Sequence, residues 1–288
     1  AVYYIERKPE NLKEIRGVAF RDETKVQDIV HTGWRELMDL SKVPFAYSNL
    51  TEFKNRIIYY ESSRGCPFSC SYCLSSIDKK LRFRDIELVK RELQFFIDNK
   101  VPQVKFVDRT FNCKHDHAME IWRYITEHDN GITNFHFEIS ADLLRAEELA
   151  LMKTMRPGLI QLEIGVQSTN PQTIKAIRRT MDFEKLKGIV EQIHSFGNIH
   201  QHLDLIAGLP YEDYDSFHKS FCDVYALRPE QFQLGFLKVL KGSHMMEMTG
   251  EYQILYKDRE PYEVLSTNWI TYEDVLKLKK VENMVEVY

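Results

Sequence analysis

Strand-like segments of this chain alternate between apolar and polar residues, and helical patterns separate them. In residues 159–167, isoleucine, leucine and valine alternate with polar residues that include Glu163 and Gln167. The same period of two occurs in residues 135–141 and 200–208. Parallel strands covered by helices on both faces are nearly continuously apolar, so the alternation predicts a sheet covered on one face only. A full or partial barrel with a polar interior has this arrangement.

The order of the elements predicts the fold class. Runs rich in β-branched and aromatic residues predict strands at 57–62, 103–108, 135–141, 159–167, 200–208 and 231–239. Apolar residues at helical spacing predict helices at 86–100, 117–128, 147–155, 183–197 and 214–227. Because strands and helices alternate, we expect parallel strands joined by crossover helices. The predicted architecture is α/β, a partial (β/α)6 TIM-like barrel.

Two less regular parts flank the predicted barrel, which we expect to occupy residues 57–240. Residues 1–56 predict an irregular lead-in with a short strand or hairpin near residues 15–30, and residues 241–288 predict a C-terminal extension. The chain begins with alanine rather than methionine, and its last residues still have a helical pattern. We therefore expect a fragment of a longer protein, with a truncated extension.

Composition excludes several classes of function. The net charge of −4 gives no strong signal for nucleic-acid binding, and we interpret the one basic run, residues 78–85, as a solvated face. No apolar run reaches the ~18 residues of a membrane helix, and no signal-peptide pattern opens the chain. Five unevenly spaced cysteines do not form an extracellular disulfide framework. These features predict a cytoplasmic protein without a membrane partner.

The polar face of the predicted sheet would carry Glu138, Glu163, Gln167, His202 and Asp204 into the barrel. Buried carboxylates need partners, because an unpaired charge is costly in an apolar interior. A polar ligand in an open barrel would provide such partners. Internal salt bridges or water are the alternative.

Three of the five cysteines, Cys66, Cys70 and Cys73, lie in one loop directly after the first predicted strand, with the spacing C-x3-C-x2-C. Functional residues of such barrels gather where strands end. A closed zinc site usually has four ligands, and Cys113 or His115 could complete one, so zinc stays open. A redox pair would explain two cysteines, not three. A [4Fe–4S] cluster held by three thiolates explains the number and leaves one iron free for a ligand.

The cysteine spacing, with the aromatic Tyr72 before the last cysteine, resembles the radical S-adenosylmethionine (SAM) superfamily, and the resemblance covers nearly all of residues 57–240. In that family the open iron binds the amino and carboxylate groups of SAM. One electron from the reduced cluster then cleaves SAM to a 5′-deoxyadenosyl radical, which abstracts hydrogen from a substrate. The resemblance therefore implies an enzyme that needs an electron donor, such as flavodoxin or ferredoxin, and a substrate that is not identified.

The same resemblance makes Tyr72 a candidate cofactor contact and implies further SAM contacts on the third and fourth strands. Glu138, in the segment FEIS, would lie near the ribose. Gln167 and Ser168, in GVQS, would face the ribose as well. Arg179 would pair with the SAM carboxylate, and a guanidinium is well suited to bind a carboxylate with two hydrogen bonds.

Three further positions follow from the second and fifth strands. In LDLIAGLPYED, Asp204 would point inward, and Gly208 would let the backbone approach the adenine. After the second strand the family commonly has a Gly-Gly-Glu-like stretch, whereas this chain has FVDRTFN. Asp108 is the candidate acceptor for the SAM ammonium there.

The segments around the cysteines resemble the branch that carries a cobalamin-binding domain before the barrel, and residues 15–47 resemble its connector. No D-x-H-x-x-G motif occurs, so cobalamin would belong to the full-length protein and not bind this fragment. This branch implies methylation or another radical modification. The fourth-strand segment is also similar to oxygen-independent coproporphyrinogen oxidase and the Elongator catalytic subunit. A tRNA-modifying methylthiotransferase or Elongator-like enzyme is one alternative, and a non-enzymatic, zinc-stabilised module is another.

Overall fold

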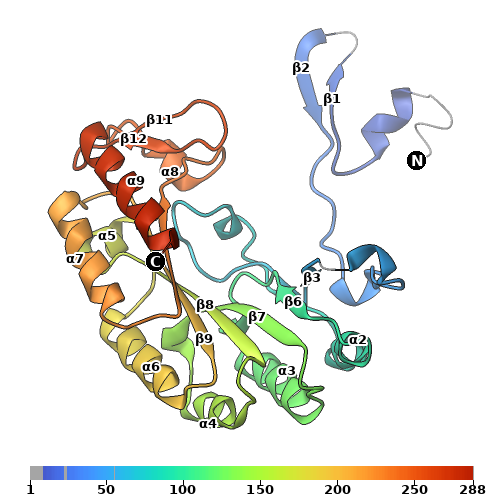
Figure 1. Ribbon diagram of the computed structural model, residues 1–288. Helices are drawn as coiled ribbons and strands as arrows, with labels where there is room; N and C mark the ends of the chain where they lie inside the picture. The colour runs from blue at the N-terminus through green and yellow to red at the C-terminus, as the bar shows by residue number, and fades with distance from the viewer. Residues whose placement is uncertain (1–8, 23–24, 55, 288) are drawn as a thin grey trace.

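The computed structural model describes residues 9–22, 25–54 and 56–287. Its centre is a curved sheet of six strands in the order β10-β9-β8-β7-β6-β3, and all neighbouring pairs are parallel (Figure 1). The strands are β3 (Ile58–Tyr60), β6 (Gln103–Phe106), β7 (Asn134–Ile139), β8 (Ile160–Gln167), β9 (His200–Ala207) and β10 (Gln231–Phe236). This confirms the predicted α/β fold and the position of each predicted strand.

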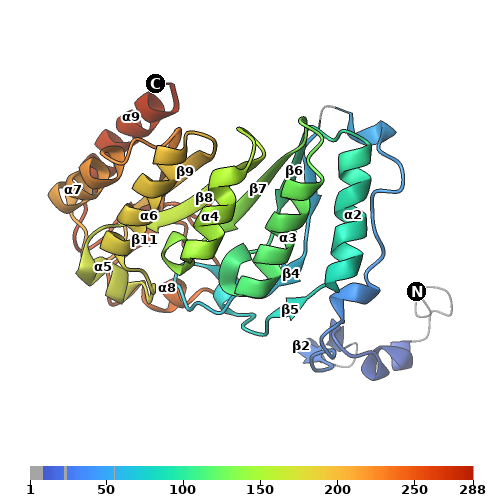
Figure 2. The same cartoon turned by 90° about the horizontal axis from the view of Figure 1, so that it is seen from below.

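Helices cover the outer face of this sheet (Figures 1 and 2). They are α2 (Ile86–Asp98), α3 (His115–Glu127), α4 (Ala146–Thr154), α6 (Phe183–Phe196) and α7 (Tyr214–Tyr225), with a short α5 (Pro171–Ala176) after β8. The apolar strand residues face these helices: Phe137, Leu162 and Ile164 are fully buried. Phe137 packs against Phe111 and Trp122, with ring centroids 4.3 and 6.0 Å away. The core therefore lies between sheet and helices, which leaves the concave face for polar side chains.

The lead-in contains the antiparallel hairpin expected near residues 15–30, formed by β1 (Ala19–Asp22) and β2 (Lys25–His31). Short 3-10 helices η1 (Pro9–Glu14), η2 (Leu40–Lys42) and η3 (Thr51–Phe53) accompany it. The buried Arg84 fixes the lead-in to the barrel, because its guanidinium donates to Leu40 O and, over 2.8 Å, to Val43 O. The same guanidinium forms a buried ion pair with Glu92. The interpretation of residues 78–85 as a solvated face is therefore wrong at Arg84.

The C-terminal extension packs at the end of the sheet beside β9 and β10. It consists of α8 (His244–Glu247), β11 (Leu255–Tyr256), β12 (Val264–Ser266) and α9 (Tyr272–Val287). Val264 N donates to Leu237 O over 2.9 Å, which attaches the extension to the segment after β10. Within the described ranges, no helix is long and apolar enough to span a bilayer.

A candidate cofactor site at the mouth of the barrel

The cysteine loop lies between two short antiparallel strands, β4 (Ser63–Arg64) and β5 (Arg82–Phe83), and carries the 3-10 helix η4 (Leu74–Ser76). All three cysteines are free thiols; Cys66 and Cys70 are buried and Cys73 is half-buried. The loop is anchored through Ser71, whose N–H donates to Ile177 O and whose carbonyl accepts from Met245 N, both over 2.8 Å. Segments far apart in the sequence therefore hold the three thiols in place.

The residues near these thiols suit an iron–sulfur cluster better than zinc. Within the part of the chain that the structure describes, no three Cys, His, Asp or Glu side chains converge where a single metal ion could bind. The two residues that could complete a zinc site are engaged elsewhere or hard to ionise. His115 contacts Glu147 and Glu148, and burial raises the pKa of the Cys113 thiol to about 11. In a [4Fe–4S] cluster each thiolate binds a different iron, so three thiols that do not converge on one point fit that cofactor.

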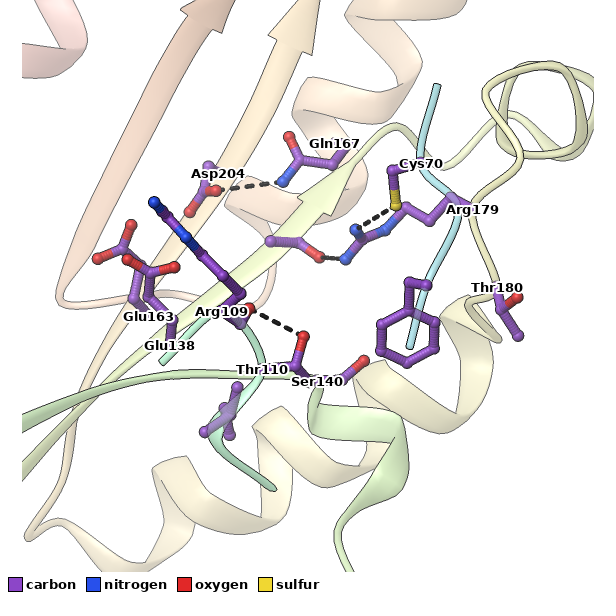
Figure 3. A pocket seen from close by; sticks show the side chains of 13 residues that line it. Cys70, Arg109, Thr110, Glu138, Ser140, Glu163, Gln167, Arg179, Thr180 and Asp204 are labelled. Atoms are coloured by element: carbon purple, nitrogen blue, oxygen red, sulfur yellow. Dashed lines mark hydrogen bonds between the residues drawn. The ribbon is translucent and has the colours of Figure 1, made fainter. Parts of the chain in front are cut away.

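A cavity of about 140 Å³ opens next to the loop, on the concave face of the sheet (Figure 3). Cys70 and Phe68 line it from the loop, and Glu138, Glu163, Gln167 and Asp204 line it from β7, β8 and β9. The strand register explains this grouping, because Glu138 is paired with Glu163 in the ladder, and Gly165 with Asp204. The predicted polar interior of the barrel is thus a cavity beside the cysteines.

Arg179 lies between the cysteine loop and the cavity (Figure 3). Its Nη2 donates to Gly165 O, and its Nη1 lies 3.9 Å from Cys70 Sγ and 3.4 Å from the Tyr72 hydroxyl. Burial raises the pKa of Tyr72, so this phenol stays protonated beside the guanidinium. Arg179 therefore supplies a fixed positive charge at the end of the cavity nearest the thiols.

The three carboxylates of the cavity have different surroundings. Glu163 accepts from His136 and Lys105, each over 2.9 Å, and these contacts lower its pKa to about 2. Burial, followed by repulsion from Glu163, raises the pKa of both Glu138 and Asp204 to about 7. Glu163 is therefore negatively charged near pH 7, whereas Glu138 and Asp204 are only partly ionised there, and a further cationic group beside them would favour their charged forms.

Several polar atoms at this site are buried without a partner among the described residues: Arg179 Nε, Gln167 Oε1 and Asp204 Oδ1. Gln167 Nε2 donates to Asp204 Oδ2 over 3.2 Å, which leaves the other oxygens free. Each such group costs about 1–3 kcal/mol when it remains unpaired. A ligand with both acceptors and donors would satisfy them, so the cavity fits a zwitterionic molecule such as SAM.

Four residues predicted to bind SAM do not line the cavity. Asp108 is fully buried and accepts from Ser62 N, Ser62 Oγ and Ser63 Oγ over 2.6–3.0 Å, so both of its oxygens are occupied. Ser168 Oγ donates to the buried Glu212 over 2.6 Å. The remaining two residues are Tyr72, which contacts Arg179, and Gly208, described next.

Gly208 has a structural reason to be glycine. Its φ is +86°, and a Cβ there would lie 2.7 Å from Val264 Cγ1 of the extension. The space that a Cβ of residue 208 would occupy is therefore filled by a side chain of β12, and the approach of adenine to the Gly208 backbone stays a prediction.

Sequence reasoning missed several residues that line the cavity: Arg109, Thr110, Ser140 and Thr180. Ser140 follows Glu138 by two residues, and a strand period of two places both on one face, so the pattern could have predicted it. Arg109 lies in the loop after β6, where the strand period of two does not apply, so the pattern could not have predicted the direction of its side chain. Its positive charge acts on Glu138 and favours the ionised carboxylate.

The raised pKa of Asp204 predicts a pH-dependent stability. In the ligand-free protein the folded state keeps a proton that the unfolded state loses near pH 4, so the free energy of unfolding falls as pH rises from about 4 to about 7. Asp204→Asn removes this effect. We expect it to be about 1–3 kcal/mol more stable than the unsubstituted protein at pH 8, with a clearly smaller difference at pH 4.5, in urea denaturation.

The exposed Asp258→Asn is the matched control and should show no such pH dependence. An equal effect of Asp204→Asn at both pH values would contradict a raised pKa.

Two protein-family models match this chain. A family model described as the radical SAM superfamily matches residues 60–223. A second model, described as a protein of unknown function (DUF4080), matches residues 250–288. The partial barrel and its three-cysteine loop define a class of iron–sulfur enzymes. Because the first match covers more than half of the chain, the chain belongs to the radical SAM superfamily, whose members use a [4Fe–4S] cluster and SAM.

Individual relatives agree with the branch inferred from the sequence. An uncharacterized methyltransferase of Pyrococcus horikoshii is 22% identical over 282 residues, covering 94% of this chain and 59% of that protein. The cobalamin-dependent radical SAM methyltransferase TokK of Streptomyces tokunonensis is 26% identical over 166 residues, covering 55% of this chain and 24% of TokK. Oxygen-independent coproporphyrinogen III oxidases are relatives as well. The chain spans about a quarter to three fifths of the length of the two methyltransferases.

A solved structure shares the fold. The cobalamin-dependent SAM radical enzyme OxsB, with aqua-cobalamin and SAM bound, superposes with a TM-score of 0.74 and 14% identity, covering 99% of this chain and 49% of OxsB. At this identity the likeness shows the fold alone. It confirms the predicted barrel.

Proposed function

We propose that this protein cleaves SAM reductively, and that its 5′-deoxyadenosyl product radical starts the modification of a substrate. One observation carries the proposal: the three-cysteine loop, Arg179 and the unpartnered polar atoms all border a single cavity. A zinc-stabilised binding module would not need a charged, partly unsatisfied cavity beside its cysteines.

The residues of the cysteine loop and of the cavity would have the following roles. Cys66, Cys70 and Cys73 would hold the [4Fe–4S] cluster, which supplies one electron to the S–C5′ bond of SAM. Arg179 would hold the SAM carboxylate, because it is the cation nearest the thiols. Glu138 and Gln167 would accept hydrogen bonds from the ribose hydroxyls, and Asp204 would orient Gln167 through the bond between them.

The wider context is also a proposal. We assign the barrel to residues 57–240, with residues 1–56 as connector and residues 241–288 as a C-terminal extension. Relatives that include a cobalamin-dependent methyltransferase favour methyl transfer in a longer protein that binds cobalamin through another part. The free cysteines suit a reducing, cytoplasmic compartment, and the electron for the cluster would come from a carrier of the flavodoxin or ferredoxin class.

The test is anaerobic reduction of the reconstituted protein with dithionite in the presence of SAM. We expect slow formation of 5′-deoxyadenosine and methionine without substrate, measured by chromatography, because the residues proposed to hold the cluster and SAM all lie in this chain. A reconstituted protein that contains four irons and binds SAM, but never forms 5′-deoxyadenosine, would refute the proposal.

Arg179→Ala is expected to weaken SAM binding by about tenfold to a hundredfold, because it removes a charge-assisted contact of about 1.5–3 kcal/mol. Arg179→Lys should recover only part of this loss, since lysine cannot form two parallel hydrogen bonds. Calorimetry on the reconstituted protein measures both. Arg178→Ala is the control, because the neighbouring Arg178 is exposed and does not line the cavity. Equal affinities of the Arg179→Ala and Arg178→Ala proteins would remove Arg179 from the site.

A further inference from the structure

The cysteine loop has two faces, and only one of them borders the cavity. Cys70 and Phe68 face the cavity together with Arg179. The other part of the loop, residues 74–80, carries two exposed apolar side chains, Leu74 at 41% and Ile77 at 65% exposure. These two side chains lie three residues apart and directly after the last of the three cysteines, where contact with a partner protein would bury them.

The same segment carries an unbalanced positive charge. Lys79 and Lys80 are exposed, and neither forms an ion pair with any residue that the structure describes. The neighbouring Arg82 is balanced by Asp78. The chain as a whole has a net charge of −4, so this basic segment is a local exception. It would attract an acidic partner.

Residues 74–80 are bonded directly to the backbone that holds the thiols. Cys66 N donates to Asp78 O over 3.0 Å, and Lys79 Nζ donates to Ser69 Oγ over 2.5 Å. Gly65, with φ +95°, packs so closely on Lys80 O that a Cβ would lie 2.6 Å from it. A partner bound to this segment would therefore be separated from the thiols only by the loop itself.

We propose that residues 74–80 form the docking surface for an acidic one-electron carrier protein. The surface has an apolar centre, Leu74 and Ile77, beside two lysines, and transient redox partners bind through small interfaces that charge complementarity orients. In the transfer the carrier loses one electron and the cluster gains one, and no bond forms or breaks. This inference rests on the proposed function, which requires one electron for each SAM cleaved, and it separates electron entry from the cavity where SAM would bind.

The test measures binding, so it does not depend on turnover. Fluorescence anisotropy of a labelled, small acidic flavodoxin would be titrated with the reconstituted protein at several salt concentrations. We expect affinity to fall as salt rises, and Lys79→Glu/Lys80→Glu to weaken binding about tenfold at low salt and flatten the salt dependence. Ile77→Asp should weaken binding as well, through the loss of apolar contact.

The matched control is Lys153→Glu/Lys185→Glu, which makes the same charge change at exposed lysines of α4 and α6. The iron content of every variant is measured first, and Lys79→Ala/Lys80→Ala replaces the charge reversal if that variant does not fold. Flavodoxin should reduce the cluster of the Lys79→Glu/Lys80→Glu protein more slowly, whereas the small cation reduced methyl viologen should not.

Unchanged flavodoxin affinity in Lys79→Glu/Lys80→Glu, or equal weakening in the control pair, would overturn the docking surface. Neither result would affect the formation of 5′-deoxyadenosine with dithionite. Failure of that reaction would instead refute the proposed function and leave the binding measurement intact.

Discussion

Replacement of Cys70 with alanine is expected to abolish stable binding of a four-iron cluster. The thiols of Cys66, Cys70 and Cys73 are fixed at separate positions by a loop that other segments anchor. Because each thiolate holds a different iron, the loss of one leaves two irons without protein ligands. After anaerobic reconstitution we expect about four irons per chain in the unsubstituted protein, and almost none in the variant, by iron analysis and visible absorption.

Two other cysteines provide matched controls. Cys222 is exposed on α7, and Cys113 is half-buried near Cys66, so Cys222→Ala and Cys113→Ala should both retain about four irons. Bound zinc that is lost in Cys113→Ala, with no iron in either protein, would instead support the zinc alternative. A protein without all three loop cysteines that still held a four-iron cluster would remove them from the site.

Glu92→Ala is expected to destabilise the protein by about 3–5 kcal/mol, because it leaves the Arg84 guanidinium buried without its carboxylate. Both side chains are almost completely buried, and Arg84 Nη2 lies 2.5 Å from Glu92 Oε1. Tyr60 also donates to Glu92 over 2.6 Å and would lose its acceptor. Urea denaturation of the ligand-free protein measures the difference.

The double variant Arg84→Met/Glu92→Leu separates charge burial from packing. It removes both charges and fills a similar volume, so it should recover much of the stability lost in Glu92→Ala. It would not restore the hydrogen bonds to Leu40 O and Val43 O, so limited proteolysis should still cut the lead-in faster than in the unsubstituted protein. A loss below about 1 kcal/mol in Glu92→Ala would show that water reaches Arg84.

Much of the fold could be predicted because each strand has one apolar and one polar face. The period of two in residues 135–141, 159–167 and 200–208 identified the strands and their inward residues without knowledge of their neighbours. The strand ends could not be predicted in this way. The run 103–108 ends as a strand at Phe106, because Asp108 turns away to bind Ser62 and Ser63.

The candidate site was predictable in part for the same reason. Glu138, Gln167 and Asp204 lie on strand faces, so the period predicted their direction, and the cavity contains all three. Ser168 and Gly208 lie just after strands, where the chain turns. Their surroundings depend on Glu212 and Val264, which come from segments that no local pattern relates to them.

The anchoring of Ser71 also sets an order of events during synthesis. Its N–H is bonded to Ile177 O, and its carbonyl to Met245 N. At about 5–20 residues per second, the ribosome adds the residues between Ser71 and Met245 in roughly 10–35 s. During that interval the Ser71 carbonyl is without its Met245 partner, so the cysteine loop lacks one of these two anchors. The anchoring of the loop is therefore complete only after the start of α8 has been synthesised.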